Sequence, residues 1–180
     1  MKRICCFIAV AFVFTPAAGF ASDLTIFGGL QRQGKITLRQ GVSNVPTLFD
    51  SQNFGLFGIR AGIGKRMLGT ESTFGYTSNF IDSRMKAVIL SQNLVVQVPT
   101  PAVRPYATVG IGPVITKGSG ITDIGTKFAV NYGGGLKVTL AGPVGGRVDI
   151  RNYTLPSVQS QTLNIFEVSL GVVFFFGRDN

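Results

Sequence analysis

The sequence contains no histidine and no tryptophan, and its two cysteines are adjacent residues near the N-terminus, Cys5 and Cys6. Histidine is the most frequent general base, so its absence excludes Ser-His and Asp-His mechanisms of hydrolysis. Because both cysteines fall within an N-terminal apolar run, the rest of the chain has no thiol for a disulfide bond or a zinc site. A carboxylate pair among Glu71, Asp149 and Glu167 is the remaining possibility, but each is expected to pair with a neighbouring base. The sequence therefore predicts no enzyme, no metal site and no cofactor.

Long hydrophobic runs are missing after the N-terminus. No stretch beyond Phe20 approaches 18 apolar residues, and no window keeps a helical period, so no membrane helix is expected. At the N-terminus, Lys2 and Arg3 precede the short apolar run 4–14 and the small residues 15–21. This pattern predicts a secretory signal peptide, residues 1–21, cut near Ala21, with an uncleaved anchor as the alternative. Residues 22–180 then form one domain.

Acidic residues are the minority. Without Lys2 and Arg3, 15 basic residues face 8 acidic ones. An exported basic protein favours anionic lipid head groups, so outer-membrane lipid and lipopolysaccharide are the expected partners. Nucleic acid is not expected, because the chain is exported and has no basic run interleaved with exposed aromatic residues.

Short alternating segments make up most of the remaining chain. In residues 147–151 (RVDIR) charged and aliphatic residues alternate, so a strand shows three ionic groups on one face and aliphatic groups on the other. Turn-forming residues separate the segments, and each strand with its connection takes about 20 residues. The eight predicted strands are residues 23–32, 53–63, 70–80, 85–98, 103–115, 127–138, 147–151 and 163–176.

Two architectures accept such strands. In a soluble sandwich or barrel the aliphatic face is the core, whereas in an outer-membrane barrel it faces lipid and the charges face a polar lumen. Long and short connections alternate, with residues 33–51 as the longest and another long loop before the last strand; the brief outer loop 81–84 is the exception. This alternation is typical of outer-membrane barrels. Aromatic residues near strand ends fit an interfacial girdle: Phe54, Phe57, Phe74, Phe80, Tyr132, Tyr153, Phe166 and Phe176.

These features favour an all-β fold, an eight-stranded antiparallel up-and-down transmembrane β-barrel. The alternative is a soluble periplasmic β-barrel that binds an apolar ligand on its aliphatic face. For the membrane barrel we expect a structural, surface-interaction or small-pore role in the cell outer membrane. The sequence does not indicate a solute or an oligomeric state.

Three segments carry a family resemblance: RPYATVGIG (104–112), NYGGGLK (131–137) and RVDIR (147–151). They resemble the eight-stranded outer-membrane β-barrel domains related to the OmpA transmembrane domain. This resemblance implies the same fold and an outer-membrane location. The final alternating residues resemble the C-terminal signal read by the barrel-assembly machinery, which is thus an expected partner. The signal residues are Leu170, Val172, Phe174 and Phe176.

The charged residues of the inner face predict an ion network that fills the lumen. Its members are Arg60, Glu71, Arg104, Lys137, Arg147, Asp149, Arg151 and Glu167. Arg60 with Glu71, and Lys137 with Asp149, are expected to pair as diagonal neighbours on adjacent strands. The network is interpreted as structural, because buried charges must be paired, and a polar conduit is the alternative. The inner-face glycines are expected to make room for long arginines, with a ligand pocket as the alternative; they are Gly110, Gly112, Gly133 and Gly135.

Overall fold

The structure, a computed structural model, describes residues 22–34, 36–39, 46–49, 53–78, 85–117, 125–158 and 161–176. All of its regular elements in these ranges are strands. A membrane-crossing helix, which needs both length and apolar character, does not occur among the described residues. The predicted signal peptide, residues 1–21, lies outside them.

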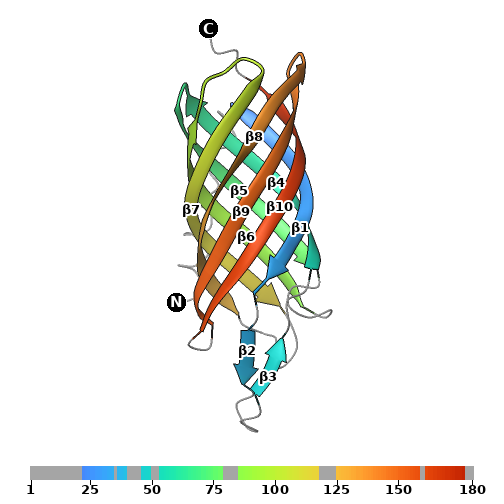
Figure 1. Cartoon of the computed structure of the whole chain (residues 1–180), viewed down its shortest axis with the longest axis vertical. Helices are drawn as coiled ribbons and strands as arrows, with labels where there is room; N and C mark the ends of the chain where they lie inside the picture. Colours follow the sequence, from blue (N-terminus) through green and yellow to red (C-terminus); the bar gives the residue numbers. More distant parts are fainter. Residues whose placement is uncertain are drawn as a thin grey trace, which may run out of the picture.

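Eight strands close into one barrel (Figure 1). Around the ring the order is β1, β10, β9, β8, β7, β6, β5 and β4, and all neighbours are antiparallel. Closure pairs the first strand with the last, so no edge remains, as a lipid-embedded sheet requires. The predicted fold class is confirmed. The strands are β1 (Asp23–Gln33), β4 (Asn53–Lys65), β5 (Leu68–Ser78), β6 (Lys86–Gln97), β7 (Val103–Lys117), β8 (Thr126–Ala141), β9 (Val144–Val158) and β10 (Gln161–Phe175).

The alternation has the predicted sidedness. In β9, Val148 and Ile150 are 42% and 51% exposed on the outer surface, whereas Asp149 between them is 1% exposed in the lumen. Exposed aliphatic and aromatic side chains recur on the outer face of every barrel strand, which is the arrangement for contact with lipid.

The two ends of the barrel differ in their connections. At one end, which we call the short-turn end, the strands are joined by residues 66–67, 98–102 and 142–143. Arg66 and Gly142 have φ angles of 53° and 55°, the left-handed conformation that two-residue hairpin turns require. The opposite end, the long-loop end, carries the connection between β1 and β4. In outer-membrane barrels the short turns face the periplasm and the long loops face outward.

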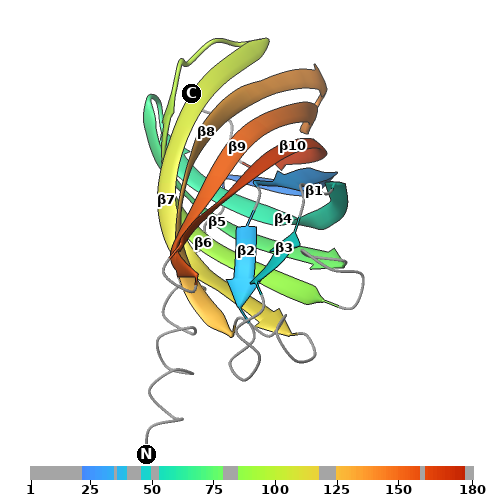
Figure 2. The ribbon, with the colours of Figure 1, turned by 60° about the horizontal axis from the view of Figure 1, so that its bottom comes forward.

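The connection between β1 and β4 contains an additional hairpin. Strands β2 (Ile36–Arg39) and β3 (Pro46–Phe49) pair with each other and project beyond the barrel at its long-loop end, at the bottom of Figure 1. In Figure 2, where this end is turned forward, the hairpin lies in front of the barrel strands. The sequence predicted only a long connection here, without strands of its own. The predicted long loop before the last strand is also wrong, because β9 continues to Val158 and β10 begins at Gln161.

An apolar cluster fills the long-loop half of the lumen. The sequence had suggested a polar inner face along every strand, and for this half that expectation is wrong. Phe54 and Tyr153, expected in the outer aromatic girdle, are 4% and 2% exposed and belong to the cluster; Phe80 lies outside the described residues. The members are Phe27, Phe54, Leu56, Met85, Ala87, Ile89, Val114, Ala129, Tyr153, Leu155, Leu163 and Ile165.

Candidate functional site

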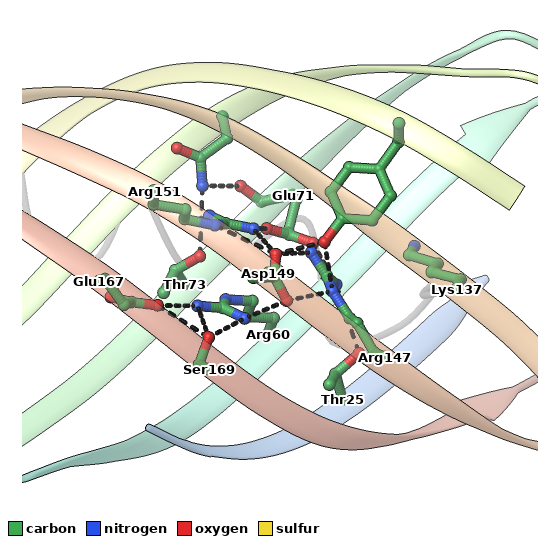
Figure 3. Close-up of polar contacts among 12 residues, drawn as sticks. Thr25, Arg60, Glu71, Thr73, Lys137, Arg147, Asp149, Arg151, Glu167 and Ser169 are labelled. Carbon is green, nitrogen blue, oxygen red and sulfur yellow. Dashed lines mark hydrogen bonds and ion pairs between the residues drawn. The ribbon is translucent and has the colours of Figure 1, made fainter. Parts of the chain in front are cut away.

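Strand β9 supplies the centre of the lumen. Because alternate residues of a strand share a face, Arg147, Asp149 and Arg151 all point inward, and each is almost completely buried. Their side chains extend away from the wall toward residues of other strands (Figure 3). One five-residue segment thus presents two guanidinium groups and a carboxylate to the rest of the barrel.

Asp149 joins the three buried arginines. Its Oδ2 atom lies 2.7 Å from Nη1 of Arg60 and 2.8 Å from Nε of Arg147, and its Oδ1 atom lies 3.0 Å from Nη2 of Arg151. The Tyr106 hydroxyl donates a hydrogen bond to Oδ1 and accepts one of 2.9 Å from Nε of Arg147. This single carboxylate therefore connects β4, β7 and β9.

Two further carboxylates complete the cluster. On β5, Oε2 of Glu71 lies 2.6 Å from Nη1 of Arg147, and Oε1 of Glu71 lies 2.7 Å from Nη2 of Arg151. Glu167 on β10 lies 2.5 Å from Nη2 of Arg60 and accepts hydrogen bonds from Gln31 and Ser169, both 3.0 Å long. Since β5 and β9 are four strands apart in the ring of eight, the pairs between Glu71 and β9 join opposite walls.

The cluster is balanced in charge. We call it the lumen ion network, and its six members are Arg60, Glu71, Arg147, Asp149, Arg151 and Glu167. Three guanidinium groups meet three carboxylates, so the formal net charge is zero. Buried ions cost several kcal/mol each unless they are paired and hydrogen-bonded, and here every member has a partner of opposite charge.

The structure places the other two expected members elsewhere. Lys137 is buried nearer the short-turn end and pairs with Asp23 at 2.6 Å, a partner that the sequence reasoning missed. The Arg104 guanidinium stacks 5.0 Å from the ring centroid of Phe175, and its Nε donates to the carbonyl oxygen of Thr100. These two residues lie at the rim, outside the lumen ion network.

The expected diagonal pairs are not the observed ones. The strand registers do make Arg60 and Glu71 diagonal neighbours, since Arg60 lies opposite Thr73. The Arg60 guanidinium nevertheless contacts Asp149 and Glu167, because its long side chain crosses the narrow lumen. Lys137, also diagonal to Asp149, turns instead toward Asp23. Both predicted pairings are therefore wrong.

A polar pocket opens at the short-turn end. Its empty volume is about 510 Å³, including the open mouth, and its charged lining comes from Asp23, Glu71, Arg104 and Lys137. Because Glu71 belongs to both, the pocket ends at the lumen ion network. Among the described residues, no three side chains of histidine, cysteine, aspartate or glutamate group together as a metal site would need.

The inner-face glycines sit where neighbouring groups come close. A Cβ atom at Gly133 would lie 3.1 Å from Cγ of Arg151, so this glycine does make room for an arginine. At Gly110 the nearest atom is instead Oδ1 of Asn93. At Gly133, Gly135 and Gly112 the nearest atom is a backbone oxygen of the adjacent strand, at 2.1, 2.0 and 1.9 Å. The space is taken up by the backbone of the adjacent strand and by side chains, which favours close packing over a ligand pocket at these positions.

Comparisons with known proteins agree with this architecture. Residues 5–176 match the family described as "Outer membrane protein beta-barrel domain". No curated protein matches the sequence closely enough to count as a relative. The structure of Neisserial surface protein A (NspA) is similar with a TM-score of 0.61 and 15% identity, covering 85% of this chain and 97% of that one. The outer membrane enzyme PagL is similar with a TM-score of 0.55 and 13% identity, covering 83% and 97%.

The similarity to PagL corrects one prediction. The sequence predicted no enzyme, because histidine is absent and the inner carboxylates were expected to pair with bases, but PagL is an outer membrane enzyme with this same barrel fold. The prediction that the chain is not an enzyme is therefore wrong, because it does not follow from the residues present. Lacking histidine excludes only histidine-based mechanisms, since carboxylates, lysine and tyrosine also serve as general acids and bases.

The soluble alternative receives no support. The apolar surface faces outward on all sides of a closed ring, whereas a soluble barrel would bury it. The ionic side chains lie within the ring, in the buried salt-bridge network. With the sequence match over residues 5–176, these features establish an integral outer-membrane protein, and the chain belongs to the outer membrane protein β-barrel domain family.

Proposed function

We propose that the protein is a sealed barrel that holds its long-loop end at the cell surface as an interaction surface, and that it does not conduct solutes. The observation that carries this proposal is the set of salt bridges from Glu71 to Arg147 and Arg151, which cross the lumen between opposite walls. All three side chains are at most 1% exposed. An eight-stranded barrel is only wide enough for its interior to be filled by side chains.

The apolar cluster supports the same proposal. A solute entering the pocket at the short-turn end meets the lumen ion network first and the apolar cluster after it. An ion entering this second layer would exchange water for mainly apolar side chains, which costs several kcal/mol. Two barriers of different chemistry in series argue against the small-pore role.

Conductance in planar lipid bilayers tests the sealed lumen. The purified barrel is expected to give a current that does not differ from that of the protein-free bilayer. A porin reconstituted in the same preparation serves as the positive control. Reproducible stepwise openings by the unmodified protein would contradict the proposal.

We further propose that β10 carries the signal for the barrel-assembly machinery. Leu170, Val172 and Phe176 expose their side chains on the outer face of the last strand, and Phe174 is half-buried there. An exposed apolar row at the closing strand is available to a receptor before the barrel closes. Changing Phe176 to alanine should slow assembly in cells several-fold, measured as the folded fraction on unheated gels after a pulse of synthesis. Changing Leu140, an equally exposed residue of β8, is the matched control.

Export and lipid contact complete the proposal. The N-terminal pattern, residues 1–21, supports a cleaved signal peptide, and N-terminal sequencing of the mature protein would locate the cut. The basic excess of the remaining chain supports contact with anionic lipid, including lipopolysaccharide.

A further inference from the structure

Two lysines face each other across neighbouring strands at the long-loop end of the barrel. Lys86 on β6 and Lys117 on β7 are direct partners in the strand register, and both side chains are exposed. Their neighbours Ala87 and Thr116 are buried in the lumen, so the two lysines point outward. Like charges directly opposite in an antiparallel pair are destabilising, and an anion between them removes the repulsion.

The lysines lie directly above an apolar surface. The next outward row toward the barrel centre is Tyr76, Val88 and Ile115, on β5, β6 and β7. Tyr76 packs against Phe57, with ring centroids 5.2 Å apart. Aromatic residues mark the edge of the lipid-facing band in outer-membrane barrels. The two ammonium groups therefore stand at the height of lipid head groups.

A hydroxyl group lies beside the two lysines, in the same row across the strands. Ser78 on β5 is the register partner of Lys86 and is also exposed. The wall formed by β9 and β10 is different near the same end, because its outward polar residues are neutral. There Thr154 donates a 2.9 Å hydrogen bond to Asn164, and Asn152 donates one of 3.2 Å to Thr154. The positive pair thus belongs to the face of the barrel formed by β6 and β7.

We propose that Lys86 and Lys117, assisted by Ser78, bind a phosphate group of a phosphorylated glycolipid in the outer leaflet. A phosphate monoester carries close to two negative charges and three acceptor oxygens, which match two ammonium groups and a hydroxyl. Lysine binds phosphate as a flexible point charge, and its stem can lie along the apolar surface below. The lipid chains would then cover the row that contains Tyr76. This site does not depend on a sealed lumen.

The test compares lipids with and without phosphate. The full protein in detergent is titrated with a bis-phosphorylated lipid A and with the same lipid after enzymatic dephosphorylation, and bound lipid is counted by native mass spectrometry. The variant K86Q/K117Q should bind the phosphorylated lipid roughly thirty-fold more weakly than the unmodified protein. Both proteins should bind the phosphate-free lipid equally and weakly. The variant K127Q, which removes a charge from the inner face at the same end, should behave as the unmodified protein.

Stability without lipid is the second readout. Since the substitutions remove a repulsion, K86Q/K117Q should melt no lower than the unmodified protein in detergent alone. Three results would overturn the proposal: equal affinity of the double variant for phosphorylated lipid, equal binding of lipid with and without phosphate, or complete occupancy of the site by inorganic phosphate alone. A lower melting temperature of the lipid-free double variant would instead assign the lysines to contacts within the protein, which also contradicts it.

Discussion

Replacing Asp149 with asparagine should lower the free energy of unfolding by about 3–5 kcal/mol, because it leaves buried guanidinium groups without their shared carboxylate. Asp149 contacts Arg60, Arg147 and Arg151, and these arginines retain only two carboxylates within the lumen ion network. The substitution keeps the size of the side chain but leaves a net charge of +1 in a buried cluster. Urea titration of the protein folded in detergent micelles measures the loss. On gels, the folded band of unheated samples should disappear at a lower temperature.

Two variants control this experiment. Asp23→Asn removes the carboxylate that pairs with Lys137 at the rim; its cost should be smaller than that of Asp149→Asn, because both side chains line the open pocket, where water can reach the ammonium group left behind. Arg60→Gln combined with Asp149→Asn restores a net charge of zero. The double variant should be destabilised by less than the sum of the single variants, because residues of one network are not additive. If Asp149→Asn unfolds at the same urea concentration as the unmodified protein, the network does not stabilise the barrel.

The strands of this barrel, and the face to which each side chain points, could be predicted from the sequence, because polar and apolar residues alternate along each strand. In residues 147–151 the period of two assigns every side chain to a face, and the structure places Asp149 inside with Val148 and Ile150 outside. The same alternation locates all eight barrel strands, although several of them extend further than expected. Face assignment needs only neighbouring residues, so a single strand carries the information.

The contacts across the lumen could not be predicted in the same way. Whether Arg60 meets Glu71 beside it or Asp149 across from it depends on the order of strands around the ring, their stagger and the width of the lumen. None of these is a local property of the chain. Tyr106 lies on the inner face, but nothing in its own strand shows that its hydroxyl would join Asp149 to Arg147.

The sequence does contain a pattern that predicts the apolar half of the lumen. Beyond Arg151 the inward positions continue as Tyr153 and Leu155, so the same face changes from ionic to apolar within one strand. On β10 the sequence changes similarly, from Glu167 to Ile165 and Leu163 going toward the long-loop end. A face that is polar over half its length and apolar over the other half therefore indicates a layered lumen, with an ionic layer next to an apolar layer.

Replacing Gly135 with alanine should have the second large effect, a loss of about 3 kcal/mol or failure to fold. A Cβ atom at this position would lie 2.0 Å from the backbone oxygen of Val148 and 2.6 Å from the Tyr106 hydroxyl. Carbon does not approach these atoms so closely, so β8 and β9 must separate and the tyrosine must also move. Movement of Tyr106 would break its hydrogen bonds to Asp149 and Arg147. The urea midpoint and the folded fraction on unheated gels measure the effect.

Gly55→Ala is the matched control, because it adds the same methyl group to a glycine within another barrel strand. A Cβ atom at Gly55 would meet nothing within 4 Å, and the residue faces outward on β4. Alanine restricts the unfolded chain more than glycine does, so Gly55→Ala should leave stability unchanged or raise it by up to about 1 kcal/mol. Combining Gly135→Ala with Tyr106→Phe should recover part of the loss, since one of the two close contacts is the hydroxyl. Equal midpoints for the two alanine variants would show that the lumen beside β8 yields to an added methyl group, and that the close packing around Asp149 is not what holds the barrel together.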